Sequence, residues 1–181
     1  MENKKISNAV NHFKTITNHK MLVMKYCFKV GLYKQGLIHD LSKYSWVEFS
    51  AGVKYFRGNI SPNAAQKMIE GCSEAWLHHK GRNKHHFEYW IDQGSKREEG
   101  YVGMKMPVKY VVEMFIDRVC ASKIYRKENY TDRDALDYYI RGKDYCIINK
   151  DTRKLLELLL YKLADEGEEA AFTFIKREIL K

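Results

Sequence analysis

The stretch "GLIHDLSKYS", residues 36–45, places a histidine directly before an aspartate on a short apolar run, with a lysine three residues after the aspartate. Imidazole and carboxylate are both strong ligands for metals, so this pair indicates a metal site where a helix would otherwise bury leucines. Adjacent side chains on a helix point about 100° apart. A metal near a helix end could still be reached by one ligand while the other binds it, or a neighbouring metal, obliquely.

Apolar residues on both sides of this stretch recur every three or four positions, which is typical of helices. Ser45 with Glu48 has the spacing of a capping box, and Ser61 before Pro62 is a typical helix start. The pattern predicts helices over about 6–30, 46–56, 62–79, 107–125 and from a cap at Asp151 onward, with a second start near Thr131 and the longest loop at 92–105. No alternating strand pattern is visible, so the fold class predicted is all-α, a helical bundle.

The overall composition favours one domain, residues 1–181, because this length is enough for one core and short for two. No run of 18 apolar residues and no signal-peptide core occurs, so we expect no membrane segment and a cytoplasmic protein. The cysteines at 27, 72, 120 and 146 form no CxxC pair and are interpreted as small buried hydrophobic residues.

The net charge of +9 favours anionic partners, such as phosphates or carboxylates. Lysines and arginines are scattered along the chain and form no long basic block. A dedicated nucleic-acid surface is therefore not indicated, although the charge would allow one. A solvated basic exterior explains the same numbers, and the oligomeric state has no signal in the sequence.

Seven histidines are present, and most of them gather in short segments that include doublets at 78–79 and 85–86. Imidazole together with carboxylate suits iron, manganese, zinc, nickel or cobalt better than magnesium. On the helix that begins at Pro62, helical periodicity places His79 close to the apolar stripe of Ala65, Met68, Ile69, Cys72 and Trp76, and His78 to one side. His79 is therefore the better inward-pointing ligand, although an ordinary core histidine is the alternative for it and a polar loop pair for His85 and His86.

The order of these residues resembles the HD-domain superfamily of metal-dependent phosphohydrolases. An early helical histidine, His19, is followed by the adjacent pair His39-Asp40. A histidine cluster comes next, and a late helical aspartate, Asp117, ends the series; the cluster consists of His78, His79, His85 and His86. "HDLSK" is similar to the "HDIGK" form common there. "AWLHHKGRNKHHFEYW" looks like an uncharacterised, DUF5662-like bacterial and phage branch. The resemblance covers about residues 10–126 and leaves 127–181 as an addition to the HD-like core.

The resemblance implies an HD-domain-like helical bundle that binds one or two divalent transition metals. The first metal would be held by His19, His39, Asp40 and Asp117. Asp40 would bridge to a second, completed by His79 and by His85 or His86. Asp40 and Lys43 would be the catalytic residues, with Lys43, and Arg82 or Arg118, binding a substrate phosphate.

The apolar pattern of the helix that carries Asp117 does not determine whether this aspartate points inward or outward. Its main apolar stripe is Val108, Val112, Phe115 and Val119, and Asp117 falls on the opposite side near Glu113. A solvated acidic face fits the pattern equally well, and Glu113 is the alternative carboxylate. Lys43 and Glu48 likewise have plain alternatives, as a surface cation and as a helix cap.

The function expected on these grounds is hydrolysis of a phosphate ester or anhydride, with a nucleotide or another phosphorylated small molecule as substrate and a metal-activated water as nucleophile. One alternative is a non-catalytic, metal-stabilised binding or regulatory protein with an anionic partner. A second alternative is a di-iron oxygenase of the HD fold. Open metal positions near Lys43 would favour an enzyme, whereas full protein ligation would favour a structural metal.

Overall fold

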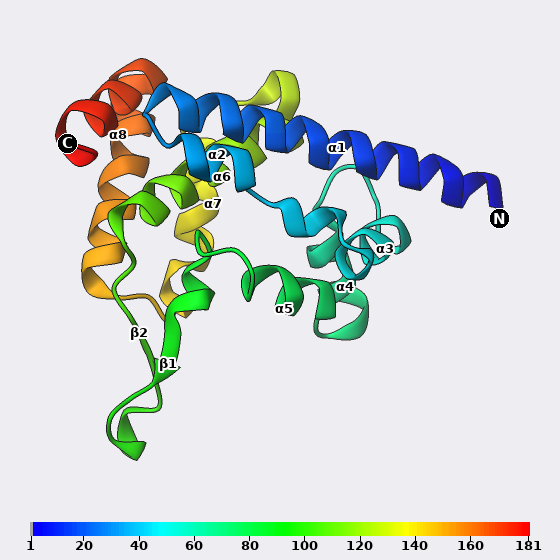
Figure 1. The fold of residues 1–181 in the computed structure, drawn as a ribbon, viewed down its shortest axis with the longest axis horizontal. Coiled ribbons are helices and arrows are strands. Elements are labelled where there is room, and N and C mark those ends of the chain that lie inside the picture. Colours follow the sequence, from blue (N-terminus) through cyan, green and yellow to red (C-terminus); the bar gives the residue numbers. More distant parts are fainter. Residues whose placement is uncertain (1) are drawn as a thin grey trace.

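Helices make up most of the molecule, and the predicted all-α class is confirmed. The structure, a computed structural model, describes residues 2–181 (Figure 1). Its α-helices are α1 (Glu2–Lys29), α2 (Tyr33–Ile38), α3 (Trp46–Lys54), α4 (Pro62–Glu70), α5 (Glu74–Lys80), α6 (Val108–Arg126), α7 (Asp134–Gly142) and α8 (Lys150–Phe174). A π-helical turn, Ile175–Ile179, follows α8, and two short strands, β1 (Ile91–Gln93) and β2 (Tyr101–Gly103), form a hairpin.

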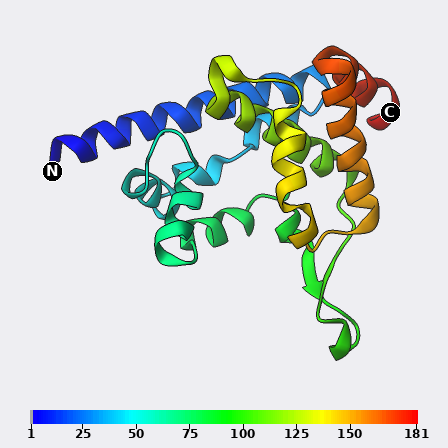
Figure 2. The same cartoon turned by 180° about the vertical axis from the view of Figure 1, so that it is seen from behind.

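The long helix α1 runs across the molecule and packs against α2, α3 and α6 (Figures 1 and 2). Helix α6 also packs against α7 and α8, so it lies between α1 and the C-terminal helices. Helices α3 and α4 lie along the N-terminal half of α1, whereas α8 lies toward the end at which α1 finishes (Figure 1). Functional side chains carried by α1, the α2–α3 connection, α5 and α6 can therefore meet in the middle of the molecule.

The apolar core joins α1, α6, α7 and α8 in one cluster of buried side chains. Leu156, Leu159, Leu160 and Leu163 of α8 are all fully buried in it. Burial of each such side chain contributes about 1.5–3 kcal/mol to stability. Residues 127–181, expected to be an addition to the core, are thus an integral part of it.

The single helix predicted over residues 62–79 is wrong, because the chain breaks between α4 and α5. Gly71 ends α4 with a φ of 77°, a left-handed conformation that glycine adopts readily, and the Ser73 side chain caps α5. The expected apolar stripe is also wrong, since Met68 and Ile69 are exposed and only Ala65 is buried. Helical periodicity does not carry across a break, so the predicted stripe does not explain the buried position of the His79 side chain.

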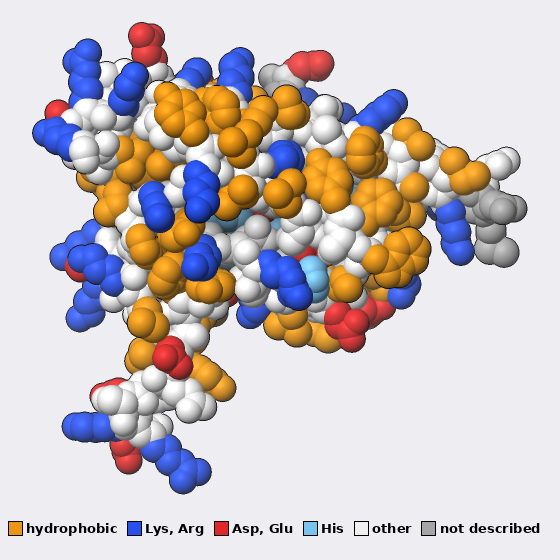
Figure 3. Space-filling view, in the orientation of Figure 1, with side chains coloured by type: hydrophobic (Ala, Val, Ile, Leu, Met, Phe, Trp, Pro, Cys, Tyr) orange, Lys and Arg blue, Asp and Glu red, His pale blue; other side chains and the backbone are white. Residues whose placement is uncertain are grey.

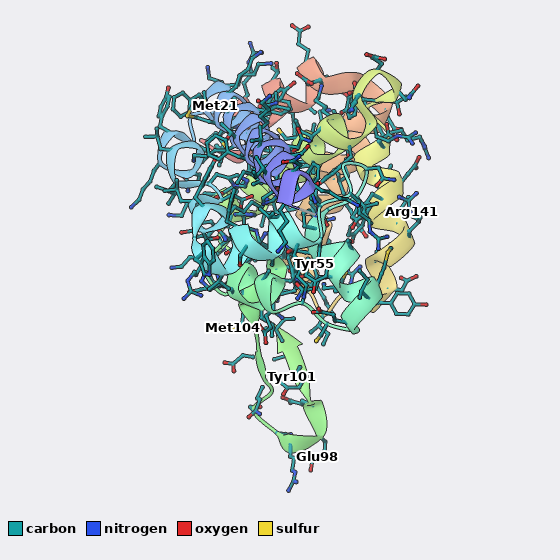
Figure 4. All side chains as sticks on the ribbon, turned by 90° about the vertical axis from the view of Figure 1, so that its right-hand side faces the viewer. Met21, Tyr55, Glu98, Tyr101, Met104 and Arg141 are labelled. Atoms are coloured by element: carbon teal, nitrogen blue, oxygen red, sulfur yellow. The ribbon has the colours of Figure 1, made fainter. Side chains whose placement is uncertain are left out.

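The loop predicted over 92–105 contains the β1–β2 hairpin. The strands pair antiparallel, with Ile91 opposite Gly103. They are three residues long, too short for an alternating apolar pattern to show in the sequence. The hairpin projects from the helical body, with Tyr101 along the arm and Glu98 at its tip (Figure 4).

Two predicted helix caps differ from the structure. Ser45 does precede α3, but its side chain caps nothing, and Glu48 is buried against histidines instead of forming a capping box. Helix α8 is capped by Asn149 and not by Asp151. Both starts were located within two residues, but the capping atoms were assigned wrongly.

The cysteine prediction holds for two of the four residues. Cys27 and Cys120 are buried, whereas Cys72 is exposed and Cys146 is partly buried. Cys72 lies in the break between α4 and α5 that the sequence did not predict. Among the helices formed by residues 2–181, none combines the length and the apolar character that crossing a membrane would require.

Candidate metal centre

The histidine and aspartate at 39 and 40 lie at a break between two helices. Helix α2 ends at Ile38, His39 is extended, and Asp40 has a φ of 54° before a short 3-10 turn begins at Leu41. Aspartate is among the few non-glycine residues that tolerate this left-handed conformation. The Lys20 ammonium donates to the carbonyls of Leu37 and His39 at 2.7 and 3.0 Å and so holds the end of α2. The two adjacent side chains are thus freed from helical spacing.

A first group of ligands joins α1, the α2–α3 connection and α6. His19 Nε2 lies 2.9 Å from Asp117 Oδ1 and 3.8 Å from Asp40 Oδ2. His39 Nε2 lies 3.4 Å from Asp40 Oδ2 and 3.6 Å from Asp117 Oδ1. One ligand atom from each of these four residues lies within 4.8 Å of all the others, which is the spacing that a single metal ion needs.

A second group lies on the other side of Asp40 and comes from α5 and the loop that follows it. His79 Nε2 and His85 Nε2 lie 3.3 and 3.4 Å from Asp40 Oδ1. His86 completes this group, again with all ligand atoms within 4.8 Å of one another. The two oxygens of Asp40 therefore face different groups, so that this carboxylate could bridge two ions.

Asp117 is not on a solvated face, the alternative that its helical position allowed. Its side chain is 17% exposed and lies beside His19 and His39. Helix α6 is buried on several sides, so it has no single inner face, and the polar residues Glu113 and Asp117 share a side of it one turn apart. The structure therefore brings Asp117 together with His19 and His39, and its role as a metal ligand stays a prediction.

Two further carboxylates contact the imidazole rings at Nδ1, the nitrogen opposite the donor atom Nε2. Glu113 Oε1 lies 2.9 Å from His39 Nδ1 and 3.1 Å from His85 Nδ1. Glu48 Oε2 lies 2.7 Å from His79 Nδ1, and its other oxygen lies 2.6 Å from His78 Nδ1. A carboxylate at Nδ1 leaves the lone pair of Nε2 for a metal and raises its basicity.

The charges of the cluster favour ionised carboxyl groups. Burial raises the pKa of Asp40, but His39 and Lys43 outweigh it and hold that pKa well below the usual range. The same balance, with His19 and His39 as the stabilising groups, holds the pKa of Asp117 well below its usual value. Burial lowers the pKa of His39, yet Asp40 and Asp117 raise it well above the ordinary value. The two carboxylates therefore stay ionised, and in the absence of a metal the protonated His39 and the Lys43 ammonium balance their charge.

The buried donor atoms themselves fit a metal. Within residues 2–181, the buried side-chain atoms without a hydrogen-bond partner of suitable geometry include a cluster of histidine and aspartate atoms and, elsewhere, single atoms of His12, Ser45, Arg118 and Tyr130. The clustered atoms are His19 Nε2, His39 Nε2, His85 Nε2, His86 Nε2, Asp40 Oδ1 and Asp40 Oδ2. An unsatisfied buried polar atom costs about 1–3 kcal/mol. The clustered atoms all lie around Asp40 and Asp117, and a role as ligands of transition metals would explain why they lack partners.

The residues expected to bind substrate have different positions. Lys43 Nζ lies 2.5 Å from Asp40 Oδ2, and its side chain remains 27% exposed. Arg82 is exposed and donates to the carbonyl of His78 at 3.4 Å, while the Arg118 guanidinium lies over the Tyr139 ring. Lys43 therefore adjoins the cluster, whereas the contacts of the two arginines do not involve its ligands.

In one histidine doublet a single histidine belongs to a ligand group, whereas in the other doublet both histidines do. His79 belongs to the second group, while His78 does not and binds Glu48 at the cluster's edge. His85 and His86 both belong to it. The supporting carboxylates Glu48 and Glu113 were missed as partners of imidazoles, and no spacing in the sequence relates either of them to its histidines.

Comparison with protein families identifies the class of this chain. Residues 8–162 match DUF5662, a family of unknown function, and the chain belongs to that family. No curated protein and no solved structure matched the chain.

Proposed function

We propose that this protein is a metal-dependent phosphohydrolase that cleaves a phosphate ester or anhydride, with a nucleotide as the substrate class and a distant relation to the HD-domain superfamily. The single observation that carries the proposal is the Asp40 carboxylate, whose Oδ2 faces the group with His19, His39 and Asp117 and whose Oδ1 faces the imidazoles of the second group. The order His19, His39-Asp40, His79, His85 and Asp117 supports the relation. The proposed cofactor is one or two ions of iron, manganese, zinc, nickel or cobalt.

The proposed metal ions and the side chains of the protein would have different roles in the reaction. A pair of divalent ions lowers the pKa of a water molecule and neutralises charge that develops on a leaving oxygen. Asp40 would hold both ions, with His19, His39 and Asp117 on one side and His79 with His85 or His86 on the other. The supporting carboxylates would keep the imidazole rings oriented toward the ions.

Lys43 is the residue proposed to hold the substrate phosphate. Burial lowers the pKa of its ammonium, but Asp40 and Asp117 more than offset this effect and raise the pKa above its ordinary value, so the side chain stays charged. It lies beside Asp40 yet remains accessible. On the face of the molecule shown in Figure 3, histidine atoms are visible between other side chains with lysine or arginine side chains beside them. A charged, accessible group next to the proposed ions suits a phosphate oxygen.

A cytoplasmic location and an anionic small-molecule partner complete the proposal. The four cysteines of the described chain are all free, in keeping with a reducing compartment. The net charge of +9 favours phosphorylated substrates.

The test is elemental analysis of protein purified without added metal, together with the variants His39→Ala and Asp40→Ala. We expect about two equivalents of a transition metal in the wild type and loss of metal from both variants. Hydrolysis of a chromogenic phosphate ester should fall with the metal, and Lys43→Ala should lower hydrolysis while metal is retained. A stable wild type without metal would contradict the proposal. Metal without hydrolysis, in wild type and Lys43→Ala alike, would instead favour a metal-stabilised binding protein.

A further inference from the structure

The Glu113 side chain contacts two histidines that belong to different halves of the candidate metal centre. His39 belongs to the group around Asp117 and His85 to the group around His79, and with Glu113 the two histidines also form a third set of donor atoms within 4.8 Å of one another. Both rings direct Nδ1 to the same oxygen, Glu113 Oε1, at 2.9 and 3.1 Å. The two ring centroids are only 4.4 Å apart, so one carboxylate lies behind both rings.

The contacts define the orientation of both rings. His39 Nδ1 is hydrogen-bonded to Glu113 Oε1, and because a carboxylate oxygen only accepts, this nitrogen carries the proton and donates it. His85 Nδ1 lies 3.1 Å from the same oxygen, close enough to donate in the same way. The opposite nitrogen, Nε2, is then the donor atom for a metal, and in both residues Nε2 is buried without a hydrogen-bond partner within the described chain. Glu113 is itself 4% exposed and lies on α6, one turn before Asp117.

Glu48 differs from Glu113 in one informative respect. Glu48 also contacts the Nδ1 atom of a candidate ligand, since its Oε2 is 2.7 Å from His79 Nδ1. Its other partner, His78, belongs to neither group of ligands. Glu48 therefore supports the second group alone, whereas Glu113 supports one histidine in each group.

We propose that Glu113 is a positioning residue that couples the two halves of the metal centre, because its single carboxylate oxygen fixes the Nδ1–H form of His39 and of His85 together. This inference rests on the proposed function. It implies that one substitution outside the ligand set weakens binding of both ions, and that the matched substitution of Glu48 weakens binding of one.

The metal test uses Co²⁺ titration of the full chain, followed by calorimetry and by visible absorption, on wild type, Glu113→Ala, Glu113→Gln and Glu48→Ala. Loss of a carboxylate that orients a ligand weakens metal binding about 10- to 100-fold. We expect Glu113→Ala to weaken both binding steps by this factor and Glu48→Ala to weaken one. Glu113→Gln keeps an oxygen acceptor and should restore most of the affinity.

Weakening of only one step by Glu113→Ala would overturn the proposal, as would identical titrations of Glu113→Ala and Glu48→Ala. Circular dichroism and thermal unfolding in EDTA identify any variant that fails to fold. Glu113→Gln, the more conservative change, then provides the comparison with Glu48→Ala, and it should weaken both steps to a smaller degree.

A second measurement separates this inference from the proposed function. Imidazole N–H protons bonded to a buried carboxylate exchange slowly with water and are visible by NMR. In EDTA, wild type and Glu48→Ala should show such Nδ1–H signals for both His39 and His85, and Glu113→Ala should show neither. Their absence from the wild type would refute the role of Glu113. Their presence in a protein that binds no Co²⁺ would refute the metal centre and leave only the orientation of the rings.

Discussion

Helix α6 separates two buried regions with opposite chemistry. On one side, Glu113 and Asp117 adjoin imidazoles and Asp40. On its other sides, fully buried apolar residues such as Phe115 and Val119 join the cluster that contains the leucines of α8. Apolar burial stabilises the fold directly, whereas buried polar atoms without partners lower its stability. The fold therefore depends on the α8 side, whereas the proposed metal centre accounts for the polar side.

Truncation in the apolar region should give the largest change in stability. Leu160 is fully buried, so Leu160→Ala should lower the free energy of unfolding by about 2–5 kcal/mol. Metal content per folded molecule should not change. Denaturant unfolding in EDTA measures the stability, and Leu158→Ala, at a position 48% exposed, is the control, with an effect within about 0.5 kcal/mol. Equal effects at both positions would show that α8 is not part of the core.

Substitution in the polar region should change metal binding and leave the fold intact. His79→Ala removes a ligand of the second group, so metal content should fall from about two equivalents to about one. His78→Ala removes a neighbour that belongs to neither group and should keep both. Elemental analysis of the two variants side by side makes the comparison. Equal metal loss from both variants would show that His78 and His79 contribute equally to metal binding, against the assignment of His79 alone.

The most narrowly confined effect, limited to acidic pH, concerns His12, a buried histidine outside both groups. Its ring lies beside those of Phe49 and Phe56, and burial, with Lys43 adding to it, lowers the pKa of His12 to about 4. The unfolded chain, with a pKa near 6.5, therefore binds more protons between these values. Stability should be complete above pH 6.5 and should fall with decreasing pH toward 4, by at most about 1.4 kcal/mol per pH unit.

The measurement for His12 is urea unfolding in EDTA at several pH values, with His12→Gln for comparison. The variant lacks the titrating ring and should show a shallower decline between pH 6.5 and 4. Parallel pH profiles of the two proteins would contradict the assigned cause. A substitution at Gly52 is unsuitable for this purpose, because a Cβ there would overlap the His12 ring.

The sequence predicted the helical class because apolar residues recur at helical spacing along α1 and α8 and fill most of the long segment of α6. It located the adjacent His39 and Asp40, and their order with the other ligands was informative without any geometry. It could not place Asp117, since a helix buried on several sides has no single apolar face from which to measure direction. The family resemblance, and not the periodicity, assigned Asp117 to the cluster.

Other features had no usable signal in the sequence. Gly71 interrupts a segment whose apolar spacing continues across the break, so α4 and α5 looked like one helix. Glu48 fitted a capping box with Ser45, a local pattern that concealed its contacts with histidines about 30 positions away. Glu113 likewise contacts partners in the α2–α3 connection and in the loop after α5. Contacts between segments so far apart in the chain depend on the tertiary fold.

The most direct test of the account is anomalous diffraction from crystals of the protein grown with Mn²⁺. The account predicts two peaks about 3.5–4 Å apart, one on each side of the Asp40 carboxylate. One should be bound by His19, His39 and Asp117, and the other by His79 with His85 or His86. No peak at Asp40, or peaks bound only by residues outside these two groups, would contradict the central claim.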